Sequence, residues 1–236
     1  DFLGLEMFNP INQKNYFSQY NLNFFKNKKY RTHVFGMGGS SLSSKLLAQF
    51  IDPKLMNKDL FIYDNLVPTY IKFNLDKLNI GHQDIFIFIS KSGNTIETKY
   101  FLHFIIKILK QKKIKKIFDK FIFITENNEN FMKKFSIKNK ILCFDHDPNI
   151  GGRFSIFSIT GLLPLISVGF SLKELLNSFI AAKQQFIKKH LTFSKNIFST
   201  IRYQNLKKLN NLVGLTYHER INAINEWYRQ IFAESL

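Results

Sequence analysis

Cysteine, tryptophan and acidic residues are scarce in this chain of 236 residues. The single cysteine, Cys143, has no partner for an internal disulfide, which agrees with a reducing cytoplasm. No apolar run of about 18 residues occurs, and no basic segment precedes an apolar one at the N-terminus, so neither a membrane span nor a signal peptide is predicted. The histidines and Cys143 show no metal-ligand spacing. We therefore expect a cytoplasmic protein without a membrane partner or a metal.

The shortage of acid leaves a large positive charge, because 17 acidic residues stand against 34 basic ones, for a net charge of +17. Such a balance suggests a nucleic-acid partner. The densest basic run follows a long apolar helix pattern, however, and lysines at a helix C-terminus interact favourably with its dipole. No RNA- or DNA-binding motif with aromatic residues at fixed spacing is found. We expect a solvated helix end and no nucleic-acid partner. The run contains Lys107, Lys110, Lys112, Lys113, Lys115, Lys116 and Lys120.

Short β-branched and aromatic runs alternate with helical patterns through much of the chain. Nearly continuous apolar runs, such as 84–90, are typical of strands buried on both faces of a parallel sheet. The repeated β/α units predict an α/β fold with a doubly wound parallel five-stranded sheet, whose ligands bind beyond the carboxyl ends of the strands. Strands are predicted over 32–35, 60–63, 85–89, 121–125 and 141–144, and helices over 41–51, 69–77, 95–112, 130–135 and 154–168.

The chain is expected to contain an N-terminal helical segment over 1–27, the α/β domain over 28–170 and a helical connector over 171–236. The chain starts without methionine and stops without a change in composition. We expect it to be a fragment whose connector leads into a second domain. Within the connector, long helices are predicted over 172–190, 193–209 and 219–232, with only a weak strand pattern over 212–215.

The segment 147–155, with the sequence DPNIGGRFS, follows the fifth predicted strand. Gly151 and Gly152 have no Cβ, so a ligand can approach their backbone closely. Arg153 then lies at the start of a predicted helix, where anions bind well. The segment favours a site for a compact anion or for charge that develops during a reaction. A left-handed turn with a surface arginine is the structural alternative.

The first predicted strand ends in the glycine-rich segment 36–41, GMGGSS, which leads into a helix. Such a turn presents backbone N–H groups to phosphate, and Ser40 and Ser41 add hydroxyl donors. A dinucleotide site is an alternative, because Asp64 ends the second strand at a suitable distance. The third glycine of that motif would fall on Ser41, however, and Ser40 would crowd a pyrophosphate. A tight turn with a serine N-cap is the structural alternative.

The third predicted strand ends in the segment 90–97, SKSGNTIE. Its hydroxyls, an ammonium and a glycine at a helix N-terminus suit a terminal phosphate monoester. A capping arrangement is also expected, with Asn94 as N-cap and Glu97 reaching back to it. Both interpretations hold together, because capping leaves Ser90, Ser92 and Thr95 free.

The segment from Ser92 onward, SGNTIET, resembles the phosphosugar-binding signature of the sugar isomerase (SIS) superfamily. Three further segments resemble the glucose-6-phosphate isomerase family: GMGGSS at 36–41, IGGRFS at 150–155 and NEWYRQIFAES at 225–235. Order and spacing agree from about His33 to the end of the chain. The GGRFS segment is the specific one, because binding and regulatory domains share the phosphosugar signature.

This resemblance implies a role for each matching residue. Arg153 would stabilise an enediolate, and Glu234 would move the proton between C2 and C1, with Gly151 and Gly152 in support. Glu226 is the nearest rival carboxylate and is expected to be structural, as is Glu97. The substrate phosphate would be held by Gly39, Ser40, Ser90, Lys91, Ser92 and Thr95.

The resemblance further implies interconversion of glucose 6-phosphate and fructose 6-phosphate through a cis-enediol, without a cofactor, in a homodimer. The family's ring-opening histidine and a later lysine lie beyond this chain, so the chain alone is expected to have little or no activity. None of the six histidines is expected to replace that histidine, and His218 is expected to be a surface cap. The alternatives are a non-catalytic sugar-phosphate-binding SIS module and a bifunctional phosphoglucose/phosphomannose isomerase.

Overall fold

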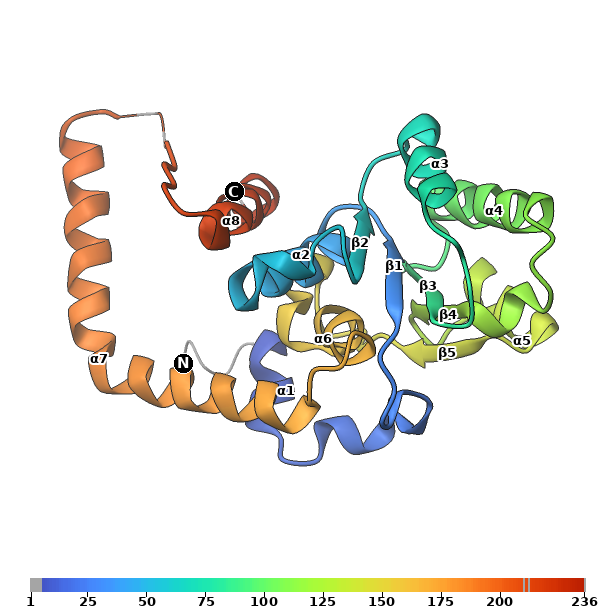
Figure 1. The fold of residues 1–236 in the computed structure, drawn as a ribbon. Helices are drawn as coiled ribbons and strands as arrows, with labels where there is room; N and C mark the ends of the chain where they lie inside the picture. Colours follow the sequence, from blue (N-terminus) through green and yellow to red (C-terminus); the bar gives the residue numbers. More distant parts are fainter. Residues whose placement is uncertain (1–5, 210, 212, 236) are drawn as a thin grey trace.

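The protein forms a parallel sheet of five strands in the order β2-β1-β3-β4-β5 (Figure 1). This computed structural model describes residues 6–209, 211 and 213–235. The α/β fold and the position of every predicted strand are confirmed to within a residue. The strands are β1 (Arg31–Phe35), β2 (Leu60–Tyr63), β3 (Asp84–Ile89), β4 (Phe121–Thr125) and β5 (Leu142–Asp145).

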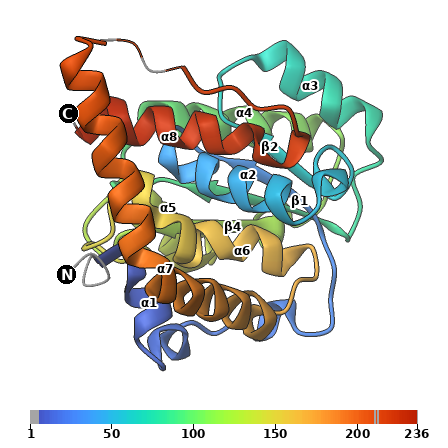
Figure 2. The same ribbon diagram turned by 90° about the vertical axis from the view of Figure 1, so that its left-hand side faces the viewer.

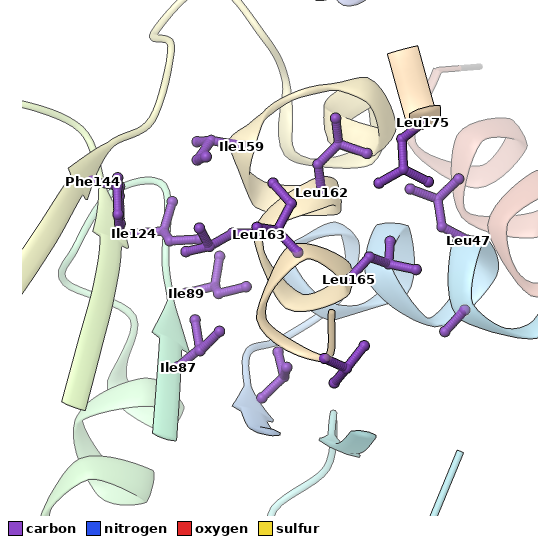
Figure 3. Close-up of a cluster of buried hydrophobic side chains, with 14 of the residues drawn as sticks. Leu47, Ile87, Ile89, Ile124, Phe144, Ile159, Leu162, Leu163, Leu165 and Leu175 are labelled. Carbon is purple, nitrogen blue, oxygen red and sulfur yellow. The ribbon is translucent and has the colours of Figure 1, made fainter. Parts of the chain in front are cut away.

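Each face of the sheet carries its own kind of side chain, because side chains alternate along a strand. In β3, the isoleucines at 85, 87 and 89 pack on one face, whereas the phenylalanines at 86 and 88 pack on the other. The isoleucine face is covered by α2 (Gly39–Ile51) and α6 (Ile159–Ser167), and Figure 3 shows Leu163 of α6 directed toward Ile89 and Ile124. The phenylalanine face is covered by α3 (Pro68–Lys77), α4 (Ile96–Gln111) and α5 (Phe131–Asn139).

Some predicted helix boundaries were wrong. The helix predicted over 154–168 is a 3-10 helix, η7 (Gly152–Phe157), followed by α6. Ser158 separates the two, because its hydroxyl caps α6 by accepting a hydrogen bond from the Thr160 N–H. The two helices predicted over 172–190 and 193–209 are one helix of 35 residues, α7 (Leu172–Leu206).

The C-terminal elements are η8 (Glu219–Ile221) and α8 (Asn222–Ser235). Residues 213–215 are not in a strand, and Leu212 of the weak strand pattern lies outside the described residues. Helix α7 runs past the body of the protein, and α8 returns to lie along α2 (Figures 1 and 2). Within the described part of the chain, no helix is long and apolar enough to cross a membrane.

The N-terminal residues form short helical turns that pack beneath the isoleucine face. Tyr16, Phe17, Tyr20 and Phe25 are buried in the same cluster as α6. The turns are η2 (Glu6–Phe8), α1 (Asn9–Asn12), η3 (Tyr16–Gln19) and η4 (Asn23–Phe25), and two further 3-10 helices are η5 (Pro53–Leu55) and η6 (Ile117–Lys120).

A buried ionic network joins the amino ends of β1 and β3. The Asp84 carboxylate accepts hydrogen bonds from Arg31 Nε at 2.6 Å and from the Gly81 N–H at 2.7 Å. His33 Nε2 lies 3.3 Å from the same carboxylate, and its ring stacks between Phe61 and Phe86. The network therefore places a titratable imidazole inside the phenylalanine core.

Replacing His33 with phenylalanine is expected to make folding less sensitive to acid. Burial lowers the pKa of His33, although Asp84 opposes the shift. In the unfolded chain His33 binds a proton near pH 6.5, whereas in the folded protein it stays neutral to a lower pH. The free energy of unfolding therefore falls as the pH decreases below about 6.5. The substitution keeps the ring stacking. It should reduce the slope of the free energy of unfolding against pH by up to about 1.4 kcal/mol per pH unit.

Urea unfolding at about pH 7.5 and about pH 5.5 would measure the change. His146, whose pKa is also lowered by burial, keeps its own contribution in both proteins. An unchanged slope would show that His33 protonates as readily in the folded protein as in the unfolded chain.

Candidate active site

The loops that follow β1, β3 and β5 meet at the carboxyl edge of the sheet. A Cβ at Gly39 would lie 2.4 Å from the carbonyl carbon of Gly152, so these two loops are in backbone contact. Lys91 Nζ donates a hydrogen bond to the Pro148 carbonyl at 2.8 Å, which joins the loops after β3 and β5. Parallel α/β sheets bind their ligands beyond the carboxyl ends of the strands, and this junction lies there.

The loop after β1 turns sharply into α2. Gly38 has φ of +53° and is the N-cap of α2, and no side chain caps this end of the helix. The serine N-cap considered from the sequence is therefore wrong, and Ser41 instead donates its hydroxyl hydrogen to the Gly38 carbonyl. Ser40 lies in the first turn of α2, where the Ser40 and Ser41 N–H groups donate to the Met37 and Gly38 carbonyls at 3.1 and 3.2 Å.

The loop after β3 gathers hydroxyl groups around a glycine. The Ser90 and Thr95 hydroxyls lie 2.7 Å apart, and the Gly93 N–H donates to Ser90 Oγ. Gly93 has φ of +64°, a backbone conformation that favours glycine. Ser92 is exposed and accepts a hydrogen bond from the Asn94 N–H at 3.3 Å. The predicted hydroxyl cluster is thus assembled by a tight turn.

The capping arrangement predicted for this loop is wrong. Helix α4 begins at Ile96, its N-cap is Thr95, and no side chain caps it. The Asn94 side chain instead accepts a hydrogen bond from the Phe131 N–H at the start of α5. Glu97 lies in the first turn of α4, where a carboxylate stabilises the helix dipole.

The Lys91 ammonium is directed toward the neighbouring loops. Besides the Pro148 carbonyl, it lies 3.5 Å from the Glu126 carboxylate after β4. His146 is buried beside this pair, and burial lowers its pKa, so it adds no charge at neutral pH. In this structure Lys91 therefore fixes the loops after β4 and β5 to the hydroxyl cluster.

Arg153 lies in η7 with its guanidinium facing α8. Gly151 has φ of −64°, and Gly152 is likewise outside the left-handed region, so the left-handed turn considered for this segment is absent from it. Arg153 Nη1 lies 3.3 Å from Glu234 Oε2, although the two residues are 81 positions apart in the sequence. Arg153 Nε is buried and has no hydrogen-bond partner among the described residues. The guanidinium therefore keeps an unused donor beside the carboxylate.

Helix α8 contributes two residues that the sequence reasoning missed. Gln230 Nε2 donates to Glu234 Oε1 at 2.9 Å, one helical turn before it. Trp227 Nε1 donates to the Arg153 carbonyl at 2.8 Å. The spacing of 227, 230 and 234 along one helix face is the signal that could have identified both.

The rival carboxylate Glu226 is engaged in an ion pair. Its side chain accepts a hydrogen bond from Lys45 at 2.7 Å, and Lys45 also lies 3.6 Å from Asp64. This contact ties α8 to α2, as expected of a structural residue. His218 is also as expected, because its Nδ1 caps η8 by accepting a hydrogen bond from the Arg220 N–H.

A pocket of about 440 Å³ opens beside Glu234. Its wall is formed by the glycine turn before α2, by the end of β2 and by α8. Among the described residues, no group of three or more His, Cys, Asp or Glu side chains could hold a metal ion. The pocket is lined by Gly38, Ser41, Leu42, Asp64, Glu226, Arg229, Gln230, Ala233 and Glu234.

Alanine at Gly39 and at Gly152 should have opposite effects on stability. A Cβ at Gly39 would overlap the Gly152 backbone at 2.4 Å, so the free energy of unfolding should fall by about 1–3 kcal/mol. A Cβ at Gly152 meets nothing within 4 Å and should change stability by less than about 1 kcal/mol. If a ligand approaches the Gly152 backbone, Gly152→Ala should still weaken fructose 6-phosphate binding. Urea unfolding and calorimetric titration test both statements, and equal losses of stability would contradict the close contact between the two loops.

Comparison with known proteins identifies the fold and the family. The fold and the loops at its carboxyl edge place the chain among α/β domains of the sugar isomerase type. A hypothetical protein of Thermus thermophilus matches with a TM-score of 0.74 and 25% identity, over 98% of this chain and 55% of that chain. A glucose-6-phosphate isomerase from Chlamydia trachomatis shares the fold, with a TM-score of 0.53 and 24% identity over 65% of this chain and 29% of that chain.

Residues 25–235 match the family model for phosphoglucose isomerase, and the chain belongs to this family. The glucose-6-phosphate isomerase of Campylobacter jejuni is 33% identical over 222 residues, which cover 91% of this chain and 52% of that protein. The glucose-6-phosphate isomerase of Methanocaldococcus jannaschii is 32% identical, over 86% of this chain and 49% of that protein. The chain spans about half the length of the curated relatives it matches.

Proposed function

We propose that this chain provides the proton-transfer half of a glucose-6-phosphate isomerase, which interconverts glucose 6-phosphate and fructose 6-phosphate. The observation that carries the proposal is the contact between Arg153, in the turn after β5, and Glu234 on α8. Abstracting a proton next to a carbonyl requires a positioned base, and the oxyanion that develops requires a fixed cation. A module that only binds a sugar phosphate has no need for this pair.

The residues divide into two groups with separate tasks. The first turn of α2 and the hydroxyls of Ser90, Ser92 and Thr95 would hold the phosphate, because helix N-termini and hydroxyls donate hydrogen bonds to anions. With the phosphate held there, the open-chain sugar would extend toward α8. Glu234 would take the proton from C2 and return it to C1, while Arg153 balances the charge of the cis-enediolate.

The Arg153–Glu234 contact must open when substrate binds. Both side chains are partly exposed, at 30% and 47%, and a single contact of 3.3 Å between exposed groups is weak. Gln230 keeps its own hydrogen bond to Glu234, so the carboxylate remains oriented when the arginine turns to the substrate. The ion pair therefore keeps the guanidinium and the carboxylate close together, and separating them costs little free energy.

Helices α7 and α8 present exposed apolar side chains beyond the α/β domain. Ile201 and Phe232 are among them, and they line a hollow with Tyr228. Because the relatives are about twice as long, we propose that 171–236 connects the 28–170 domain to a second half that covers this hollow. The separately expressed C-terminal half of the Campylobacter jejuni relative should bind the chain, and Ile201→Asp should weaken that binding. Equal binding by both variants would place the second half elsewhere.

The intact protein would be a cytoplasmic homodimer that requires neither metal nor cofactor. The second half would supply the histidine that opens the sugar ring and a lysine, so the chain alone should not complete the isomerisation. Rapid conversion of glucose 6-phosphate by this chain alone would contradict this division of tasks. A mannose phosphate converted as fast as glucose 6-phosphate by the completed enzyme would favour the bifunctional alternative.

Deuterium exchange separates the isomerase from a sensor. Fructose 6-phosphate opens spontaneously to its keto form, so a base alone can exchange its C1 proton in D2O. We expect the chain to catalyse slow deuterium uptake at C1, measured by NMR, and Glu234→Gln to abolish it because the amide is not a base. Glu226→Gln is the matched control and should retain the exchange. Binding of fructose 6-phosphate without any exchange would support the sensor.

A further inference from the structure

A buried pair of serine hydroxyls joins α2 to the turn that carries Arg153. Ser43 and Ser155 have no exposed surface, and their Oγ atoms lie 3.0 Å apart. Ser43 Oγ lies 3.1 Å from the Gly39 carbonyl, and Ser155 Oγ lies 2.7 Å from the Gly152 carbonyl. The pair therefore connects α2 to the Gly152 carbonyl, next to Arg153.

The count of hydrogens shows that the bridge is a directed chain. Each hydroxyl has a single hydrogen to donate but accepts through two lone pairs. Ser155 donates to the Gly152 carbonyl, its shortest contact, which leaves its oxygen free to accept from Ser43. Ser43 then gives its single hydrogen to Ser155 and has none for the Gly39 carbonyl, so the chain runs from α2 through Ser155 to the Gly152 carbonyl. Since both groups are buried, breaking either link would leave an unsatisfied polar atom in the core.

The bridge coincides with the closest backbone approach between the two loops. Gly39 leaves no room for a Cβ against the backbone of Gly152 and Arg153. A movement of the first turn of α2 must therefore be transmitted to Arg153, because packed backbone cannot be compressed. The Ser43–Ser155 hydrogen bonds also make the Arg153 turn follow α2 when the helix moves away, because they hold the two segments together.

We propose that Ser43 and Ser155 are positioning residues that couple phosphate binding at α2 to the placement of the Arg153 guanidinium. The inference rests on the proposed function, because it takes the phosphate to bind at the first turn of α2. It adds a linkage: a phosphate group that orders α2 also sets the distance of Arg153 from the sugar. A phosphorylated sugar would then meet a correctly placed arginine, whereas an unphosphorylated sugar would not.

The chain contains its own reporter for this coupling. Trp227 is the single tryptophan, and its indole N–H donates to the Arg153 carbonyl at 2.8 Å. Indole emission responds to changes at that hydrogen bond. Titration with inorganic phosphate therefore reports the Arg153 turn by fluorescence, while calorimetry reports binding itself.

Ser44 provides a matched control on the same helix. Its hydroxyl is equally buried and donates to the Thr160 carbonyl at 3.0 Å, so it bonds α6 rather than the Arg153 turn. Ser44→Ala should lose a comparable hydrogen bond but keep the coupling. A purely structural role for all three serines would make the three alanine variants behave alike.

In the unsubstituted protein we expect inorganic phosphate to change Trp227 emission. Ser43→Ala and Ser155→Ala should bind phosphate within about twofold of the original affinity but lose the emission change. Their preference for fructose 6-phosphate over phosphate should fall roughly three- to tenfold, as expected for one lost hydrogen bond. The double variant should equal the single ones, because the two hydroxyls act as one unit.

An emission change that survives in both alanine variants would overturn the coupling while leaving the proposed function intact. Failure of the unsubstituted protein to bind phosphate or fructose 6-phosphate would instead overturn the proposed function, and the coupling with it. Should an alanine variant fail to fold, Ser155→Cys replaces the hydroxyl with a somewhat larger thiol that is a weaker donor, and it must show the same loss of coupling.

Discussion

Replacing Asp84 with alanine is expected to lower the free energy of unfolding by about 3–5 kcal/mol, enough to leave much of the protein unfolded. The carboxylate is fully buried and holds Arg31 through two hydrogen bonds, at 2.6 and 2.9 Å. It also accepts the Gly81 N–H at 2.7 Å. With alanine at position 84, the largely buried Arg31 guanidinium and the Gly81 N–H would both lose their acceptor. The cost of leaving these donors unsatisfied adds to the loss of the hydrogen bonds themselves.

Urea unfolding of the variant beside Asp76→Ala measures this difference. Asp76 also pairs with a basic residue, Lys112, at 3.1 Å, but its side chain is half exposed. A surface pair contributes less than about 1 kcal/mol, so the control should unfold almost as the original protein does. Similar midpoints for the two variants would mean that Asp84 is solvated in solution and that the network does not hold β1 to β3.

The fold was accessible from the sequence because its main signal is local. Apart from Asp84 and Thr125 at their ends, strands β3 and β4 alternate Ile and Phe, which indicates burial on both faces wherever the strand lies in the sheet. The loops that carry Ser90 and Arg153 follow directly from the ends of such strands. Their meeting at one edge needs no further information, because parallel strands all point their carboxyl ends the same way.

The parts that sequence reasoning missed depend on contacts between distant segments. Asparagine is a residue type that commonly serves as an N-cap, yet the side-chain oxygen of Asn94 accepts a hydrogen bond from the N–H of Phe131, which lies 37 positions away. Gln230 shares a helix face with Trp227 and Glu234, but its contact with the Gly38 turn depends on how α8 packs against α2. The break at Ser158 has a local cause, because its hydroxyl caps α6, but the close packing of the Arg153 turn on Gly39 is a contact between distant segments.

Replacing Arg153 with alanine is expected to weaken binding of an anionic enediolate analogue about 10²- to 10³-fold, the usual effect of removing one oxyanion donor. A suitable analogue is a five-carbon sugar-acid phosphate, whose carboxylate imitates the enediolate oxygens. Inorganic phosphate should bind within about twofold of its original affinity, because the α2 and Ser90 loops keep their donors. Trp227 still reports binding, since its partner is the main-chain carbonyl of residue 153.

Arg229 is the matched control, because it lies on α8 and lines the pocket that Glu234 also lines. If the arginines act only by attracting anions, Arg229→Ala and Arg153→Ala should weaken the analogue and phosphate alike. If Arg153 acts on charge that develops in the reaction, Arg153→Ala alone should weaken binding of the enediolate analogue while leaving the affinity for phosphate nearly unchanged. Arg153→Lys should recover part of the loss, since a point charge replaces some of the attraction but not the paired donors of a guanidinium. The ratio of analogue to phosphate affinity thus decides whether the turn after β5 serves catalysis or binding alone.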